Sequence, residues 1–436
     1  MSVKKVAIII AAILLVMIPA LLLVNYNRVK KPVVLELGIF SGSNWDVPNW
    51  QRYKIFDEAI EEFERLNPNI KIKYRSGTLK DDYSEWLAQK IVTGREPDVF
   101  AVLPSDFNTL ASIGILKNLD ELIAGDKDFD INRMYENAVK TGQFQGSQYA
   151  LPSEVVPVLM FVNKTLLQKE GIPMPQDDWT WDDFNILCKK LTKDTDGDGI
   201  IDQFGTAGFT WQHAVYTNGQ QLFDANGTTA CFDKSGVLEA IKFVRDIHKL
   251  SLNAKVEDFN SGRVAFSPFT FPSYRVYKNY PYRIKMFNKF DWECIKLPRG
   301  PHGRNASELY NFPIGISSRT RHINEAWKFL EFLTVNEATQ MNVFRYSQGV
   351  PVLRGVVESK EAEDIVFKNN IQNENFIDTK VLGQIIEQSI VTPRFQKYEQ
   401  AMGMADKEIF QIIEGGKNPE DTLLKLNREL KSFLKQ

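Results

Sequence analysis

The chain has 436 residues, with 53 basic and 55 acidic side chains and a formal net charge of −2. This length exceeds the size at which a single hydrophobic core stops growing, so we expect two domains or lobes. The balanced charge provides no basic face for nucleic acid, and three cysteines imply no disulfide framework.

The first predicted element is an apolar segment of membrane length. Residues 6–24 (VAIIIAAILLVMIPALLLV) contain no polar side chain. As a helix they would be about 28 Å long, close to the roughly 30 Å hydrocarbon core of a bilayer. The segment is long for a cleaved leader, and no small-residue cleavage pattern follows it. A lipoprotein needs a cysteine just after the apolar core, and the first cysteine of this chain is Cys188. We therefore expect 1–31 to be an uncleaved signal anchor, with a cleaved leader as the alternative. Lysine and arginine counts leave its orientation open.

Strands and helices alternate in the next part of the chain. Apolar and alternating patterns predict strands at 33–40, 70–74 and 99–103, and helical spacing predicts helices at 55–66, 83–93 and 107–113. This order is typical of a parallel sheet with helices on its faces. Ligands bind beyond the carboxyl ends of such strands, which makes the loops 41–45, 76–79 and 104–106 candidate binding loops.

The pattern changes near residue 150. Residues 149–162 (YALPSEVVPVLMFV) form a long apolar run that contains Pro152 and Pro157. Prolines at these positions disfavour a helix and favour a strand that crosses between two bodies. Helices follow near 165–170 and 181–191, a second short strand is expected at 312–318, and the C-terminal part is helical.

Five segments in order carry a family resemblance: TGREPDVFAV (93–102), LPSEVVPVLMFVNKTLLQKEGI (151–172), GFTWQHAVYTNGQQLFD (208–224), SGRVAFSPF (261–269) and FPIGISSRTRHINEAWKFLEFLT (312–334). Together they resemble the extracellular solute-binding proteins of carbohydrate ABC transporters (family 1, in the maltose-binding-protein-like superfamily). The similarity covers nearly all of the chain after residue 33.

The resemblance implies an α/β fold of two lobes, periplasmic-binding-protein-like and type II-like, joined by hinge strands behind the N-terminal helix. The first lobe would hold 33–150 and 314–350, and the second 151–313 and 351–436. The implied function is the carbohydrate-binding subunit of an ABC importer, which holds a sugar or oligosaccharide between its lobes and delivers it to the permease subunits. We expect a monomer on the outer face of the cell membrane, or a secreted or periplasmic protein if the leader is cleaved.

A sugar has apolar faces and a rim of hydroxyls, so its binder needs flat aromatic rings and fixed polar groups. Ser43, Asn44 and Trp45 offer both in the loop after the first strand. Asp106 and Glu154 match places where the family often presents polar sugar contacts. The alternatives are a surface position for Trp45 and a helix cap for Asp106.

Three more candidates come from later in the chain. Trp211 stands at a family position near the cleft, although it could instead pack the start of a helix. Phe271 lies where the family commonly places a stacking aromatic, but its register is open because the text reads Pro-Phe-Thr-Phe-Pro. Tyr310 precedes the second crossover and could reach the cleft.

An acidic loop predicts a cation site. Asp194-Thr-Asp196-Gly-Asp198-Gly-Ile200-Ile-Asp202 places side-chain oxygens at positions 1, 3, 5 and 9 of an EF-hand-type loop and a backbone carbonyl at position 7. Repulsion among these carboxylates favours a cation. We expect structural Ca²⁺ on these five residues, although Gly205 stands where the EF-hand has its glutamate. The alternative is an acidic surface turn.

Catalytic signatures are missing from the sequence: it has no G-x-S-x-G, H-E-x-x-H, C-x-x-C or Gly-rich phosphate loop. We therefore expect a binding protein and not an enzyme. A glycoside-active enzyme, which needs only two placed carboxylates, and a surface sugar sensor are the alternatives with the same cleft.

Overall fold

The computed structural model describes residues 32–45, 49, 51–74, 77–224, 226–273, 290–367, 379–393 and 395–436. The apolar segment 6–24, on which the anchor prediction rests, lies outside these residues. In the described ranges, no helix has both the length and the hydropathy that crossing a bilayer requires.

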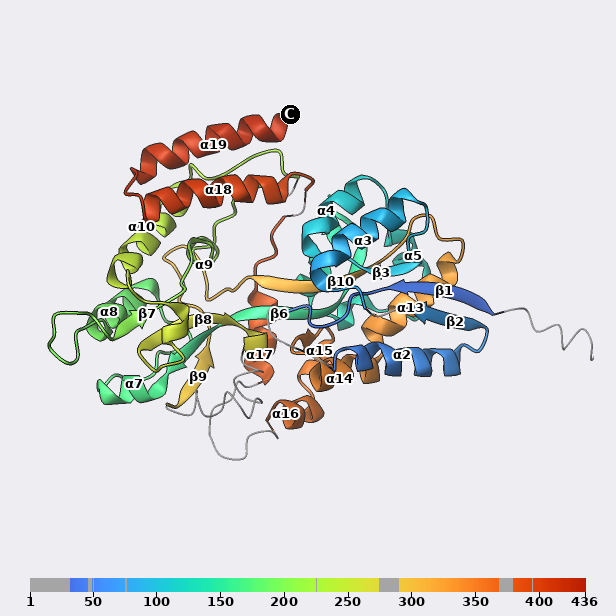
Figure 1. Ribbon diagram of the computed structural model, residues 1–436, viewed down its shortest axis with the longest axis horizontal. Helices are drawn as coiled ribbons and strands as arrows, with labels where there is room; N and C mark the ends of the chain where they lie inside the picture. The colour runs from blue at the N-terminus through green and yellow to red at the C-terminus, as the bar shows by residue number, and fades with distance from the viewer. Residues whose placement is uncertain are drawn as a thin grey trace, which may run out of the picture.

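A mixed sheet runs through both lobes (Figure 1), with the strand order β2-β1-β3-β10-β6-β8-β7 and with β11 and β9 also paired to β6. Its strands are β1 (Val33–Gly38), β2 (Ile70–Tyr74), β3 (Val99–Ala101), β6 (Ala150–Asn163), β7 (Phe204–Thr206), β8 (Val264–Thr270), β9 (Trp292–Ile295), β10 (Leu309–Ile316) and β11 (Val350–Pro351). A separate hairpin joins β4 (Gln143–Phe144) and β5 (Ser147–Gln148).

The first lobe begins with the predicted parallel strands. β1 pairs in parallel with both β2 and β3. In β2, Ile70 and Ile72 are buried while Lys71 and Lys73 are exposed, as the alternating pattern predicts. The helices of this lobe are α2 (Tyr53–Leu66), α3 (Lys80–Val92), α4 (Pro104–Ser112), α5 (Asp120–Gly125), α6 (Glu136–Lys140), α13 (Ile323–Val335) and α14 (Glu337–Tyr346).

The long strand β6 connects the two lobes. Residues 150–157 pair antiparallel with β10, and Val158–Val162 pair with β8. All of its 14 residues are buried, which explains the apolar run in the sequence. The pairing with β10 shifts register between Phe312 and Pro313, so a bulge accommodates the prolines of this strand pair.

The second lobe surrounds the other half of β6. Its helices are α7 (Lys164–Lys169), α8 (Trp181–Leu191), α9 (Trp211–Thr217), α10 (Ser235–Leu250), α18 (Tyr398–Ile413) and α19 (Pro419–Lys435). Short 3-10 helices occupy Ile131–Arg133 in the first lobe and Val256–Asp258 in the second.

The chain returns to the second lobe later than the domain boundary that we predicted from the sequence. We expected all of 351–436 in the second lobe. Instead, α15 (Arg354–Val357) and α16 (Lys360–Phe367) contact α14, and α17 (Thr379–Gln388) contacts α6 of the first lobe. The crossing itself is 389–393, where the Ile390 N–H donates to the Ser307 carbonyl over 2.7 Å. Helices α18 and α19, which follow this crossing, pack on α10 of the second lobe (Figure 1).

Candidate functional site

A buried ion pair lies where β6 leaves the first lobe. Nε of Arg52, just before α2, is 3.3 Å from Oε1 of Glu154, and these side chains are 3% and 2% exposed. The Ser347 hydroxyl donates to the other carboxylate oxygen of Glu154. The Arg52 guanidinium also lies over the ring of Phe312, 4.1 Å from its centroid. We call Arg52, Glu154, Ser347 and Phe312 the Arg52 cluster.

Electrostatics in this cluster reflect its burial. Loss of water lowers the pKa of the Arg52 guanidinium, because a charge is costly in an apolar site. The attraction and hydrogen bond of Glu154 act in the opposite direction. Arg52 and Glu154 therefore each keep the charge of the other balanced in the buried site. Glu154, which we predicted to contact sugar, already has two protein partners, Arg52 and Ser347.

Trp45 lies against the same cluster. Its ring packs, partly buried, on the larger hydrophobic core, and its backbone N–H donates to the Ser43 hydroxyl over 3.0 Å. A Cβ added at Gly349 would sit 3.1 Å from Trp45 Nε1 and would overlap Oε2 of Glu154. Nε1 itself is buried and has no acceptor among the described residues. The structure thus brings Trp45 and Glu154 together around one glycine.

The other first-lobe candidates, Asn44 and Asp106, each accept a hydrogen bond from another side chain of this lobe. Asn44 is 4% exposed, and its carbonyl accepts a hydrogen bond from Lys80 Nζ over 2.5 Å. Asp106 lies in the first turn of α4 without capping it, and its Oδ2 accepts from the Ser84 hydroxyl over 2.6 Å. Burial and the Asp106 charge raise the pKa of Tyr83, which lies close by.

Phe271 approaches the cluster along the edge of β6. β8 ends at Thr270 opposite Val158, and β11 begins at Val350 opposite Val155. Phe271 and the Gly349 turn therefore meet β6 between these two positions. The Phe271 side chain is fully buried, so in this arrangement its ring face packs on protein and is not presented to solvent.

Two candidates lie away from the cluster. Trp211 is 6% exposed in the second-lobe core, and its Nε1 donates to Oδ1 of Asp406 on α18 over 3.0 Å. This is the structural alternative, a tryptophan that packs the start of a helix. Tyr310 is 41% exposed, and its hydroxyl donates to Oε2 of Glu308 over 3.1 Å.

Sequence reasoning missed Arg52, Ser347 and Gly349. One signal was present: a glutamate inside an otherwise apolar run requires a partner, because an isolated carboxylate is too costly to bury. That signal predicts that a cation exists but does not say which of the 53 basic residues supplies it.

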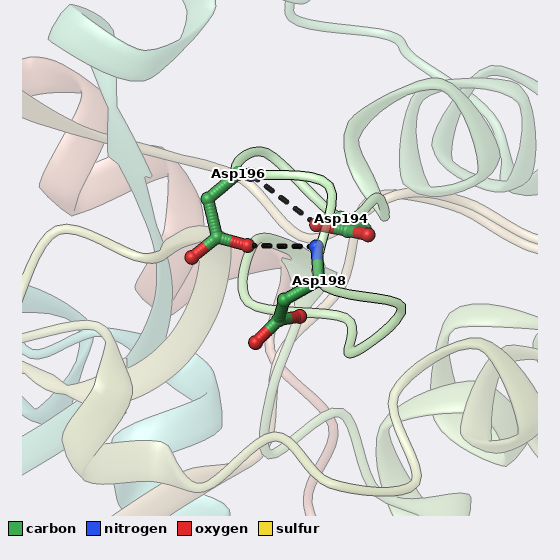
Figure 2. A group of neighbouring side chains, drawn as sticks. All are labelled: Asp194, Asp196 and Asp198. Atoms are coloured by element: carbon green, nitrogen blue, oxygen red, sulfur yellow. Dashed lines mark hydrogen bonds between the residues drawn. The ribbon is translucent and has the colours of Figure 1, made fainter.

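The acidic loop brings three of its five predicted residues together. Carboxylate oxygens of Asp194, Asp196 and Asp198 all lie within 4.8 Å of one another (Figure 2). Asp194 accepts backbone N–H groups of Gly197 and Gly199, each over 2.7 Å, and these hydrogen bonds lower its pKa. The Ile200 N–H donates to Asp198 over 2.8 Å.

Asp202, the fourth carboxylate of the loop, has a different partner. Its carboxylate accepts the backbone N–H and the hydroxyl of Thr195, over 2.9 and 2.6 Å. Asp202 therefore closes the loop and does not join the group of three.

A cavity of about 730 Å³ also lies between the lobes. The first lobe contributes Asn137, Lys140 and the 143–146 turn, the second contributes Tyr216, the 219–223 loop and 302–304, and the 389–393 crossing also lines it. The sugar-binding candidates predicted from the sequence are absent from its described lining.

These features define a two-lobed binding protein whose nine-stranded sheet passes through a hinge. The family described as bacterial extracellular solute-binding protein matches residues 48–340, and the chain belongs to that family. The maltotriose-binding protein of Pyrococcus abyssi is 22% identical over 390 residues, which cover 86% of this chain and 78% of that protein. The multiple sugar-binding protein of Streptococcus mutans is 24% identical, with 70% and 73% covered.

Solved structures agree on the fold. The cyclic alpha-maltosyl-1,6-maltose binding protein from Arthrobacter globiformis superposes with a TM-score of 0.76 at 16% identity, covering 93% of this chain and 99% of that one. The sugar-binding protein MalE from Xanthomonas citri gives 0.74 at 17% identity, with 92% and 97% covered. The expected two-lobed α/β fold is confirmed.

Proposed function

We propose that this protein is the carbohydrate-binding subunit of an ABC sugar importer. It takes up a sugar or oligosaccharide at the hinge and passes it to the permease subunits. Relatives named for maltotriose and for multiple sugars support the ligand class. The observation that carries the proposal is the Trp45 indole N–H, which is buried beside Glu154 without an acceptor in the described chain.

The chemistry of this place suits a sugar. A buried donor without an acceptor costs free energy that a ligand oxygen would recover. A sugar hydroxyl could accept from Nε1 of Trp45, while the ring supplies an apolar face for the pyranose. The crossings that join the lobes allow them to move about the hinge, so that the second lobe closes over the bound sugar.

Calorimetric titration with maltotriose tests the proposal, after a thermal-shift screen of mono- and oligosaccharides if maltotriose does not bind. Trp45→Ala should weaken affinity by about 1–3 kcal/mol, because ring and donor are both lost. Trp45→Phe should cost less than Trp45→Ala, about 1 kcal/mol, because it removes the donor but keeps a smaller aromatic ring.

The matched control is Trp327→Phe, which removes an indole N–H bonded to Asp126 on the first lobe. Its affinity for maltotriose should equal that of the wild type. Unchanged affinity in Trp45→Ala would remove Trp45 from the site, and cleavage of the oligosaccharide during the titration would favour the glycoside-active alternative.

The cellular setting is part of the proposal. We place the protein outside the cytoplasm as a monomer, tethered by 1–31 to the outer face of the membrane. Membership of an extracellular protein family supports the compartment, and the membrane-length apolar segment supports the tether. Mass spectrometry of the mature N-terminus would test it, since a start near residues 25–32 would identify a cleaved leader. Uptake assays in a deletion strain separate transport from sensing.

We also propose that the acidic loop holds a structural Ca²⁺. Asp194, Asp196 and Asp198 would supply carboxylate oxygens and Ile200 its carbonyl, as hard oxygen ligands suit this ion. Asp202 would support the loop through Thr195. The ion would offset the repulsion of three neighbouring carboxylates.

A further inference from the structure

The 730 Å³ cavity lies on the opposite side of the sheet from the Arg52 cluster. Adjacent residues of a strand point to opposite faces. On β10, Phe312 lies under the Arg52 guanidinium, whereas Asn311 donates to the carbonyl of Thr141 at the end of α6. Helix α6 supplies Asn137 and Lys140 to the cavity. The cavity is therefore behind the hinge, and the sugar proposal does not use it.

The charges along the cavity have one sign. Lys140 and Arg304 line it together with the imidazole of His302, and its described lining contains no aspartate or glutamate. Lys140 and His302 also contact Glu136 and Glu239, which lie outside the lining. Arg304 is exposed, and the described residues offer it no ion pair. A ligand with negative oxygens would find the positive charge that this wall leaves available.

The remaining polar groups favour the same kind of ligand. Side-chain amides of Gln145 and Gln221 are exposed at the cavity and can donate from either lobe. Gln145 also has a φ of 51° in the two-residue turn between β4 and β5. Such a turn prefers asparagine or glycine, so a glutamine held there at a conformational cost points to a use for its side chain.

The aromatic residues argue against a second sugar site. Tyr216, Phe223 and Tyr398 line the cavity, but they are only 4%, 1% and 8% exposed. Their rings pack on protein and leave no free face for a pyranose to stack on. The exposed polar side chains of the wall include Lys140, Arg304, Gln145 and Gln221, whose N–H donors match the oxygens of a carboxylate or phosphate.

We propose that this cavity is a second ligand site, which takes a small polar anion bearing carboxylate or phosphate groups and which opposes sugar binding at the hinge. Lys140 and Gln145 of the first lobe and Arg304 and Gln221 of the second hold the anion between them. The 389–393 crossing, which runs from α17 to α18 (Figure 1), forms part of the same wall.

The opposition to sugar follows from the hinge. Lobes that close on one face of a hinge separate on the other, and an anion that bridges them behind the hinge resists that separation. Linkage then requires that sugar and anion weaken each other by the same factor. This coupling rests on the proposed sugar function, whereas the anion site does not.

The test uses the full chain in calcium-free buffer at constant ionic strength, with inorganic phosphate and succinate as probes. Calorimetry should show saturable binding of at least one of them. Arg304→Ala and Lys140→Ala should each weaken that binding about tenfold, the usual effect of losing one charged hydrogen bond of about 1.4 kcal/mol. Arg321→Ala removes an equivalent exposed arginine outside the cavity and should bind the probe like the wild type.

Absence of saturable binding for both probes, or wild-type affinity in Arg304→Ala, overturns the anion site. Maltotriose should bind several-fold more weakly when the probe is saturating, and equal or tighter binding overturns the coupling. If the anion binds and no sugar does, the sugar function fails while the anion site stands.

Discussion

Arg52 and Glu154 form an ion pair across the start of the hinge in which both partners are almost completely removed from water, 3% and 2% exposed. One residue precedes α2 and the other lies on β6, so this contact holds a first-lobe helix to the strand that crosses between lobes.

Removing the carboxylate of this pair should be severely destabilising. Glu154→Ala leaves the Arg52 charge buried without a partner, which costs about 3–5 kcal/mol. Glu62→Ala is the matched control, because it removes an exposed pair with Arg65 and should change the free energy of unfolding only slightly. Urea unfolding of both variants measures the difference. Equal losses would show that the buried pair contributes no more than a surface one.

Gly349 should not tolerate a side chain. A Cβ there overlaps Oε2 of Glu154 and crowds Nε1 of Trp45, so Gly349→Ala should cost about 1–3 kcal/mol and also weaken sugar binding. The control is Gly403→Ala in α18, where a Cβ meets nothing within 4 Å. That change should be neutral or stabilising by up to about 1 kcal/mol, because alanine is the better helix former. Thermal unfolding and calorimetry read out both effects, and a fully stable, sugar-binding Gly349→Ala would contradict the packing described above.

Calcium should stabilise protein that has been treated with a chelator. An ion at 100 times its Kd adds about 2.7 kcal/mol to the free energy of unfolding, visible as a rise in Tm. Asp196→Asn should remove the response, since its carboxylate is one of the group of three. Asp224→Asn alters a carboxylate bonded to Thr228 and Thr229 in another turn, and should keep the full response. A wild-type Tm that does not change when calcium is added would show that the loop is an acidic turn without a structural ion.

Stability at acid pH should depend on Asp126. The hydrogen bond from the Trp327 indole lowers the pKa of this carboxyl, so the bond contributes to stability above the unfolded-state pKa of about 4. That contribution is lost as the pH falls through the folded-state value. Trp327→Phe should therefore be less stable than the wild type at pH 7, with the difference shrinking toward pH 3. Denaturant titrations at several pH values measure this, and a difference that does not depend on pH would refute the assignment.

Local patterns predicted the elements well but not their distant partners. Alternation in 70–74 predicted β2 and the apolar run at 149–162 predicted β6. Both predictions are possible because burial on one or both faces of a strand sets the polarity of residues that are neighbours in the sequence. The pairing of Arg52 with Glu154 joins residues 102 positions apart, which no periodicity encodes. Likewise, the late crossing at 389–393 depends on α17 packing against α6, a contact between two helices remote in sequence.

The candidate site shows the same division. Trp45 could be predicted because loops after parallel strands gather at one edge of a sheet, and the structure places it beside Glu154. Trp211 was also predicted as an aromatic residue near the cleft, but its side chain packs in the second lobe, where Asp406 of α18 accepts its indole N–H. Whether Trp211 is buried in its lobe or faces the cleft depends on the position of α18, which is set by tertiary packing.

Because β6 gives its first half to one lobe and its second half to the other, neither lobe is a separable module. A fragment ending at Pro157 would carry the first half of β6 without its β10 partner, leaving a row of unpaired backbone groups open to aggregation. Exchanging a lobe with a relative therefore means transplanting two separate segments of the chain at once. Recombination within such a protein is then expected to succeed at surface loops such as 194–202 and to fail along the shared strand.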